Sequence, residues 1–109
     1  MFSFLRSRTP EIDVEELDRR IAEGTVHVID VREDHEFRSG HVGVAKHVPL
    51  RTLPAKVPTL KDDRKYAVIC ASGSRSAQAA DFLIAQGFDA VSVRGGTSAW
   101  IRSGRVVIR

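Results

Sequence analysis

Short apolar stretches that alternate with helix-forming stretches constrain the fold of this chain more than any other feature. The apolar stretches, each predicted to be a strand, are residues 10–12, 26–31, 46–48, 66–70 and 90–93. Strands that alternate with helices are typical of a parallel sheet whose two faces are both covered. The sequence therefore predicts an α/β fold with three layers, in which helices cover both faces of a roughly five-stranded parallel sheet.

The stretches between the predicted strands differ in how strongly they indicate helix. Residues 14–23 follow a capping aspartate, carry apolar residues four apart on one face and end at a glycine. Residues 76–86 are the clearest helix, because four apolar residues line one of its faces. Two prolines keep any helix within residues 50–60 short or broken. Residues 97–103 predict a short helix that places Trp100 in the core.

A chain of 109 residues is expected to fold as one domain, which the pattern of elements places at residues 10–104. Residues 1–9 are predicted to be a frayed N-terminal extension. Residues 105–109 form a C-terminal tail, whose apolar side chains could pack on this domain or on a second copy of the chain. We therefore expect a monomer or a weak homodimer.

The composition argues against several classes of binding. Lysine and arginine exceed aspartate and glutamate by 17 to 14, but the basic residues are scattered and few aromatic residues lie among them. Nucleic-acid binding is therefore not expected, whereas a small anion suits the same charge. No segment approaches the length of a membrane span, so we expect no membrane association and a cytoplasmic protein.

The single cysteine excludes an internal disulfide and any zinc site built on cysteine pairs. A free thiol is also compatible with the reducing cytoplasm. His35, His41 and His47 follow one another at intervals of six residues, which fits no zinc-binding pattern. We therefore expect neither a metal nor a cofactor.

The only cysteine, Cys70, ends the apolar run 66–70 and is followed by small residues, a glycine and a predicted helix. In a parallel sheet, ligands bind at the carboxyl ends of the strands, where Asp30 and Arg94 are also expected. Backbone N–H groups and a helix dipole at such a place stabilise a thiolate and lower the pKa of the thiol. The sequence therefore favours a reactive Cys70 over the alternative, an inert cysteine that packs as a small apolar residue.

Four residues separate Cys70 from Arg75, which is a Cys-x4-Arg spacing. We predict that residues 70–75 curl between strand and helix with their N–H groups directed at the sulfur, forming an anion-binding nest. Gly73 is expected to adopt a positive φ. The Ser76 hydroxyl is expected to cap or open the following helix and to form a hydrogen bond inside the loop. Such a loop fits a thiolate, or a sulfur that carries one further sulfur.

Several motifs in the same order resemble the rhodanese (sulfurtransferase) family. They are Val28-Ile29-Asp30-Val31-Arg32-Glu33, Glu36-Phe37-Arg38-Ser39-Gly40-His41-Val42, His47-Val48-Pro49-Leu50, Cys70-Ala71-Ser72-Gly73-Ser74-Arg75-Ser76, and Val93-Arg94-Gly95-Gly96 followed by Trp100. The resemblance extends over roughly residues 10–104 and implies the rhodanese-like fold. His47 departs from the family, which usually has a small polar residue there, and this departure concerns only the packing near Pro49.

The resemblance implies a single-domain sulfurtransferase. In this family the thiolate, here Cys70, takes a sulfane sulfur from a small anionic donor such as thiosulfate and holds it as a persulfide. A thiol, cyanide or a protein acceptor then removes the sulfur, so ping-pong kinetics are expected. The resemblance also implies that substrate and persulfide lie in the loop formed by Ala71, Ser72, Gly73, Ser74, Arg75 and Ser76.

Two other functions stay open at this point. A rhodanese-like module could regulate another protein or carry sulfur with little turnover, although such modules often lack the cysteine. A cysteine-dependent phosphatase or arsenate reductase is less favoured, because phosphatases of related architecture use a Cys-x5-Arg loop. The extra residue admits a tetrahedral oxyanion, whereas the shorter loop of this chain fits a single sulfur better.

Three charged residues, Asp30, Arg32 and Glu36, are assigned supporting roles. An acid near the end of a buried strand must be paired or hydrogen-bonded. We therefore expect Asp30 to hold loop amides or an arginine in place rather than to act in catalysis. Arg75 could bind the anionic group of the donor, or it could point away and pair with Glu36 or Asp30. His41 is expected to have a structural role.

Overall fold

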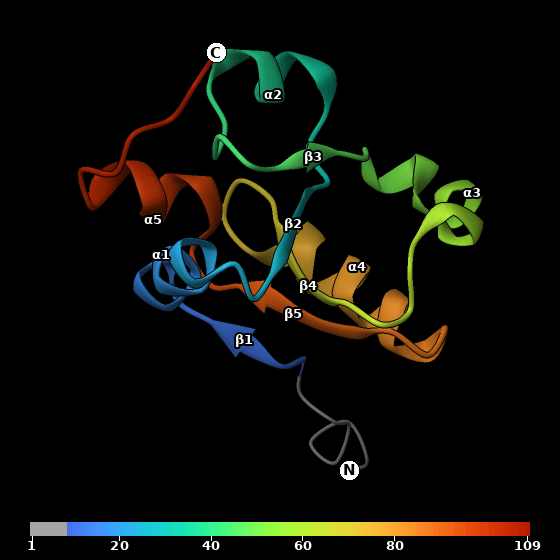
Figure 1. Cartoon of the computed structure of the whole chain (residues 1–109). Helices are drawn as coiled ribbons and strands as arrows, with labels where there is room; N and C mark the ends of the chain where they lie inside the picture. Colours follow the sequence, from blue (N-terminus) through green and yellow to red (C-terminus); the bar gives the residue numbers. More distant parts are fainter. Residues whose placement is uncertain (1–8) are drawn as a thin grey trace, which may run out of the picture.

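A computed structural model describes residues 9–109 and confirms the predicted α/β fold (Figure 1). Of the N-terminal extension predicted at residues 1–9, residues 1–8 lie outside the described residues, while the Thr9 hydroxyl donates to Asp81 at 2.8 Å. Five strands form one parallel sheet: β1 (Glu11–Ile12), β2 (His27–Asp30), β3 (Lys46–His47), β4 (Lys65–Ile69) and β5 (Asp89–Val93). Their order in the sheet is β1-β5-β4-β2-β3, so the strand that leads to Cys70 lies at the centre.

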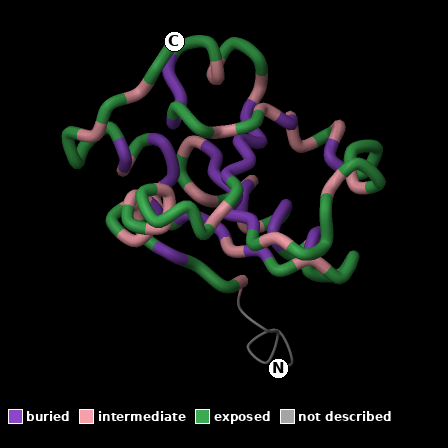
Figure 2. The backbone as a smooth tube through the Cα atoms, in the orientation of Figure 1, coloured by how far each residue is buried: buried purple, intermediate pink, exposed green. Residues whose placement is uncertain are grey.

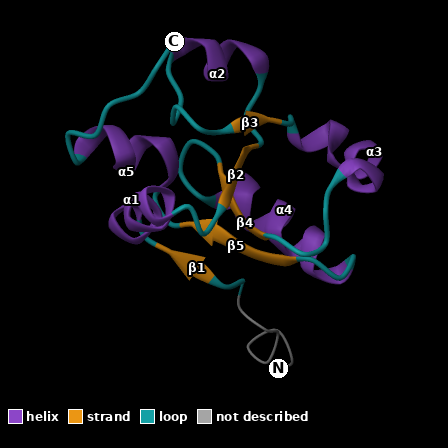
Figure 3. Ribbon diagram, in the orientation of Figure 1, coloured by secondary structure: helices purple, strands orange, loops and turns teal. Residues whose placement is uncertain are grey.

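Helices cover both faces of the sheet, as Figure 3 shows. One face carries α1 (Val14–Glu23) and α5 (Gly96–Arg102). The other face carries α4 (Ser74–Ala85) and the short helices η2 (Leu50–Thr52), α3 (Leu53–Lys56) and η3 (Val57–Thr59). The prolines thus break the segment 50–60 into short pieces, as the sequence predicts. Helix α2 (Asp34–Ser39) follows β2 and lies beyond the sheet edge.

The central strand is buried on both faces (Figure 2). Side chains of a strand alternate between the faces, so Tyr66 and Val68 pack with α4, while Ala67 and Ile69 pack with α1 and α5. Trp100 is buried on the second of these faces, as predicted. Because apolar side chains pack against β4 from both faces, the first residue after it has a well-defined position.

The helix after the cysteine loop begins earlier than the sequence analysis predicts. It starts at Ser74 rather than at residue 76, with Gly73 as its N-cap residue at a φ of +116°. A glycine turns the chain into the helix directly, because it has no Cβ to oppose a positive φ. Arg75 and Ser76 therefore belong to the first turn of α4, and the expectation that Ser76 caps the helix is wrong. Its hydroxyl lies instead within 3.1 Å of the Gly73 carbonyl oxygen.

The C-terminal tail packs on its own domain. The N–H of Ile108 donates to the His41 carbonyl and the N–H of His41 donates to the Ile108 carbonyl, both at 2.9 Å. The indole N–H of Trp100 donates to the carbonyl of Val106, also at 2.9 Å. His41 is in turn held by Phe37, whose carbonyl lies 2.7 Å from the His41 Nδ1.

Within residues 9–109, no helix combines the length and apolar character that a membrane crossing needs.

Candidate functional site

Cys70 is the first residue after β4, and its side chain faces the start of α4, because its sulfur contacts N–H groups there. Its sulfur accepts hydrogen bonds from the N–H groups of Gly73, at 3.0 Å, and Ser76, at 3.3 Å. The Ser76 hydroxyl oxygen lies 3.4 Å from the same sulfur. The residue exposes only 1% of its surface. The sulfur therefore lies in a nearly closed cradle of N–H donors at the positive end of a helix dipole.

This cradle changes the acidity of the thiol. Burial raises the pKa of Cys70, because a thiolate is poorly solvated away from water. Hydrogen bonds from the Ser76 hydroxyl and from the N–H groups of Ser76, Gly73 and Ser72 act in the opposite direction. These bonds outweigh the burial, and the pKa of the thiol lies below its ordinary value. A larger share of Cys70 is therefore thiolate at neutral pH, which is the nucleophilic form.

The N-terminus of α5 orients the peptide groups of the loop. The Cys70 carbonyl accepts from the Thr97 N–H at 2.8 Å and from the Thr97 hydroxyl at 3.1 Å, and the Ala71 carbonyl accepts from the Ser98 N–H at 3.0 Å. In a trans peptide the C=O and the N–H point in opposite directions. Because α5 holds these carbonyls, the N–H groups that follow them are turned away from α5.

The sequence analysis missed this contribution of α5. The available signal was the pair Gly95-Gly96 one residue after a predicted strand, because glycines allow two backbone segments to approach closely. A Cβ placed on Gly96 would lie 2.4 Å from the Cys70 carbonyl oxygen and 2.6 Å from that of Ala71. The absence of a side chain at this position is what allows α5 to reach the loop.

Arg75 pairs with Glu36, one of the two alternatives that the sequence leaves open. Its two terminal nitrogens donate to the two carboxylate oxygens at 2.7 and 2.9 Å. Glu36 also accepts from the backbone N–H of Glu33 at 2.9 Å and completes a capping box at the start of α2. The fork-to-fork pair ties α2 to the first turn of α4. The positive charge of Arg75 is thus offset by a carboxylate.

We expect Glu36→Gln to lower stability at neutral pH but not in acid. The Arg75 guanidinium lowers the pKa of Glu36 from 4.5 to about 2. A carboxyl whose folded-state pKa is lowered stabilises the protein fully above the unfolded pKa, and this contribution is lost as the pH falls from about 4.5 towards 2. Urea unfolding should show a deficit of about 1–2 kcal/mol at pH 7, allowing for solvent screening. The free energies of unfolding of the wild type and of Glu36→Gln should become equal as the pH approaches 2. A difference in stability that does not depend on pH would contradict this account.

Asp30 and Arg32 form a buried ion pair next to the site. Arg32 donates to both oxygens of Asp30 at 2.9 to 3.1 Å and also to the Gly40 carbonyl at 2.8 Å. The Arg32 backbone N–H donates to Asp30 as well. Each partner of the pair is almost fully buried. The structure thus gives Asp30 the arginine partner expected for it, and the pair connects the end of β2 with the segment after α2.

Arg94 lies outside this arrangement. Its side chain is largely exposed and reaches Glu11 on β1 at 3.3 Å.

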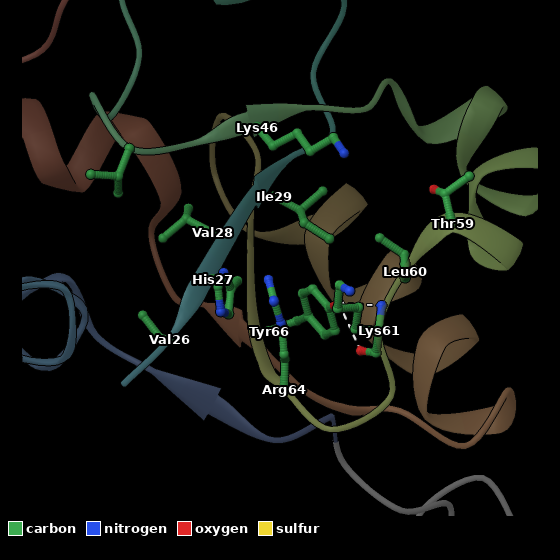
Figure 4. A pocket seen from close by; sticks show the side chains of 11 residues that line it. Val26, His27, Val28, Ile29, Lys46, Thr59, Leu60, Lys61, Arg64 and Tyr66 are labelled. Atoms are coloured by element: carbon green, nitrogen blue, oxygen red, sulfur yellow. Dashed lines mark hydrogen bonds between the residues drawn. The ribbon is translucent and has the colours of Figure 1, made fainter. Parts of the chain in front are cut away.

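The N-terminal half of β2 and the start of β4 border a separate hollow of about 340 Å³, which is not lined by Cys70 or its loop (Figure 4). Within residues 9–109, no group of three histidine, cysteine or carboxylate residues is placed to hold a metal ion.

Comparisons with known proteins identify the family of this chain. The chain matches the family described as Rhodanese-like domain over residues 13–103. It is similar to YtwF of Bacillus subtilis (strain 168), named as a candidate sulfurtransferase, with 41% identity over 91 residues that cover 83% of this chain and 88% of the relative. A sulfurtransferase of Allochromatium vinosum is 35% identical over 100 residues, which cover 90% of this chain and 94% of the relative.

A solved structure gives the same result. The crystal structure of a rhodanese-related protein from Thermoplasma volcanium superimposes with a TM-score of 0.85 at 38% identity, covering 91% of this chain and 97% of that one. The sequence relatives carry sulfurtransferase names, which supports sulfur transfer as the class of activity. Because the family match spans α1 to α5, and with them Cys70 and its loop, this chain belongs to the rhodanese family.

Proposed function

We propose that this protein transfers a sulfane sulfur through a persulfide formed on Cys70. The observation that carries the proposal is the sulfur of Cys70 held by the N–H groups of Gly73 and Ser76 at the start of α4, with its pKa lowered. The same donors suit the outer sulfur of a persulfide, which is also anionic. Loop residues Ala71, Ser72 and Ser74 have small side chains, which suits a loop that must hold a second sulfur atom.

The two half-reactions balance without a cofactor. The Cys70 thiolate attacks the outer sulfur of thiosulfate, a new S–S bond forms, and the S–SO₃ bond breaks with its electron pair leaving on sulfite. An acceptor thiolate or cyanide then attacks the outer sulfur of the persulfide. The S–S bond breaks and its electron pair returns to Cys70 as the thiolate, so the protein is regenerated.

We propose a small anionic donor, with thiosulfate as the first to test, and a thiol, cyanide or protein acceptor. Burial of Cys70 favours a donor with a slender, exposed outer sulfur. Because Glu36 already pairs with Arg75, the N–H groups and the α4 dipole would supply most of the attraction for the donor. Removing one such donor group costs about 3 kcal/mol in comparable oxyanion sites.

The experiment is to incubate the protein with thiosulfate and record its intact mass before and after adding cyanide. We expect a gain of one sulfur atom, its loss on adding cyanide, and the appearance of thiocyanate, with ping-pong kinetics at steady state. No adduct with thiosulfate or with other sulfane donors would overturn the proposal. An adduct that forms but is passed to no acceptor would identify a sulfur carrier with little turnover instead.

A phosphatase or arsenate reductase is disfavoured by the loop of four residues between Cys70 and Arg75 and by the pairing of Arg75 with Glu36. In such an enzyme an arginine at this place would need to face the oxyanion. The assay is hydrolysis of an aryl phosphate, for which we expect no activity above the Cys70→Ser background.

A further inference from the structure

Ser92 on β5 is a fully buried residue whose hydroxyl faces α4 directly. Its side chain makes one hydrogen bond within residues 9–109, to the hydroxyl of Ser76, with the two oxygens 2.7 Å apart. A buried hydroxyl is costly unless it is bonded, and an alanine would fill most of the same space. The sequence analysis missed Ser92, because nothing in the segment 90–93 distinguishes it from other strand residues.

The Ser76 hydroxyl has three neighbours but only one proton. Its oxygen lies 2.7 Å from the Ser92 hydroxyl, 3.1 Å from the Gly73 carbonyl oxygen and 3.4 Å from the Cys70 sulfur. A hydroxyl donates once and accepts through its lone pairs. Which neighbour receives the Ser76 proton therefore depends on what the other groups donate.

The protonation state of Cys70 sets this choice. As a thiol, Cys70 donates to the Ser76 oxygen, and Ser76 is free to donate to the Gly73 carbonyl or to Ser92. As a thiolate, Cys70 only accepts, so a hydrogen bond between the two groups requires Ser76 to donate its proton to the sulfur. Its oxygen is then left to accept, and the Ser92 hydroxyl is the group placed to donate to it. A chain of donors that all point one way is strengthened by mutual polarisation.

We propose that Ser92 is a positioning residue that acts through Ser76: it donates to the Ser76 oxygen and so holds the Ser76 hydroxyl as a donor to anionic sulfur on Cys70. For the thiolate this depends only on the resting site. Its extension to the persulfide rests on the proposed function. The hydrogen-bonding groups Ser92, Ser76 and Cys70 come from β5, α4 and the end of β4. The packing of these three elements keeps the three groups within hydrogen-bonding distance of one another.

The test compares the pKa of Cys70 in the wild type and in Ser92→Ala, without any sulfur donor. Thiolate absorbance in the ultraviolet reports it directly, because Cys70 is the only cysteine and the Cys70→Ser variant supplies the background. We expect Ser92→Ala to raise this pKa by about 0.5–1 pH unit. Ser92→Thr, which keeps a hydroxyl, should restore most of the shift. Ser39→Ala, a control whose hydroxyl bonds only within α2, should leave the pKa unchanged.

A double-mutant cycle separates this role from a merely structural one. If Ser92 acts through Ser76, then Ser92→Ala should produce no further shift in a Ser76→Ala background. An unchanged pKa in Ser92→Ala, or an equal shift with and without the Ser76 hydroxyl, would overturn the proposal. Failure of the proposed function is a distinct result: thiosulfate would then leave no persulfide on the wild type, whatever the pKa of Cys70.

Discussion

Replacing Cys70 with serine should abolish sulfur transfer while leaving the fold intact. The serine hydroxyl stays protonated at neutral pH, and its oxygen is a poor nucleophile towards sulfur, so no persulfide analogue accumulates. We expect no gain of mass with thiosulfate and a fall in thiocyanate production of roughly a thousandfold or more. The new hydroxyl meets the same N–H groups that Gly73 and Ser76 direct at the sulfur, so stability should change by about 1 kcal/mol.

Cys70→Ala provides the second variant, because it removes the polar atom altogether and should be equally inactive. Circular dichroism and urea unfolding of both proteins show whether the loss is chemical rather than a loss of fold. Turnover retained in either variant would show that another group accepts the sulfur. That outcome would remove the basis for assigning the reaction to Cys70.

Gly96→Ala should be the most damaging glycine-to-alanine change among the glycines of residues 9–109. The added Cβ would lie 2.4 Å from the Cys70 carbonyl oxygen and 2.6 Å from the Ala71 carbonyl oxygen, and neither backbone atom can rotate away as a flexible side chain would. The start of α5 must retreat, which breaks the bonds from Thr97 and Ser98 to those carbonyls. We expect a loss of about 3 kcal/mol in the free energy of unfolding. The pKa of Cys70 should rise, because the loop N–H groups lose their orientation.

Gly24→Ala is the matched control for this prediction. Gly24 ends α1 with a φ of +71°, close to the +58° of Gly96, but a Cβ there meets no atom within 4 Å. The control therefore reports the cost of a left-handed backbone for alanine alone, about 1 kcal/mol, with no change at Cys70. Urea unfolding and thiolate absorbance measure both variants. Equal losses of stability, or an unmoved pKa in Gly96→Ala, would contradict a role for the α5 contact.

Much of the fold was predictable because its signals are local. Asp13 and Gly24 bound α1 as predicted, since a capping carboxylate and a glycine act on residues within one turn of themselves. The carboxylate of Asp13 accepts from the Glu16 N–H at 2.8 Å, and Gly24 adopts the left-handed conformation. The start of α4 was missed by two residues, because the sequence marks Gly73 as a turn but does not say how soon helix follows it.

The site was predictable to a lesser degree. The position of Cys70 after a buried strand and before a helix follows from its neighbours along the chain, and so does the positive φ of Gly73. The direction of Arg75 does not, because its partner Glu36 is 39 residues away and the sequence also offers Asp30. Only the position of α2 over the first turn of α4 selects one carboxylate from the two.

The sequence by itself determined the layered parallel sheet, the place of Cys70 at the end of a strand and the length of the loop that follows it. These depend on periodicity, spacing and the conformational preferences of single residues, which act over a few positions. The tertiary structure alone decided three contacts of the site. Thr97 donates to the Cys70 carbonyl, Glu36 pairs with Arg75, and the Ser92 hydroxyl is hydrogen-bonded to that of Ser76. Hydrogen bonds of this kind form across distances of about 3 Å between residues far apart in the chain, so only the packing of complete elements selects the partners.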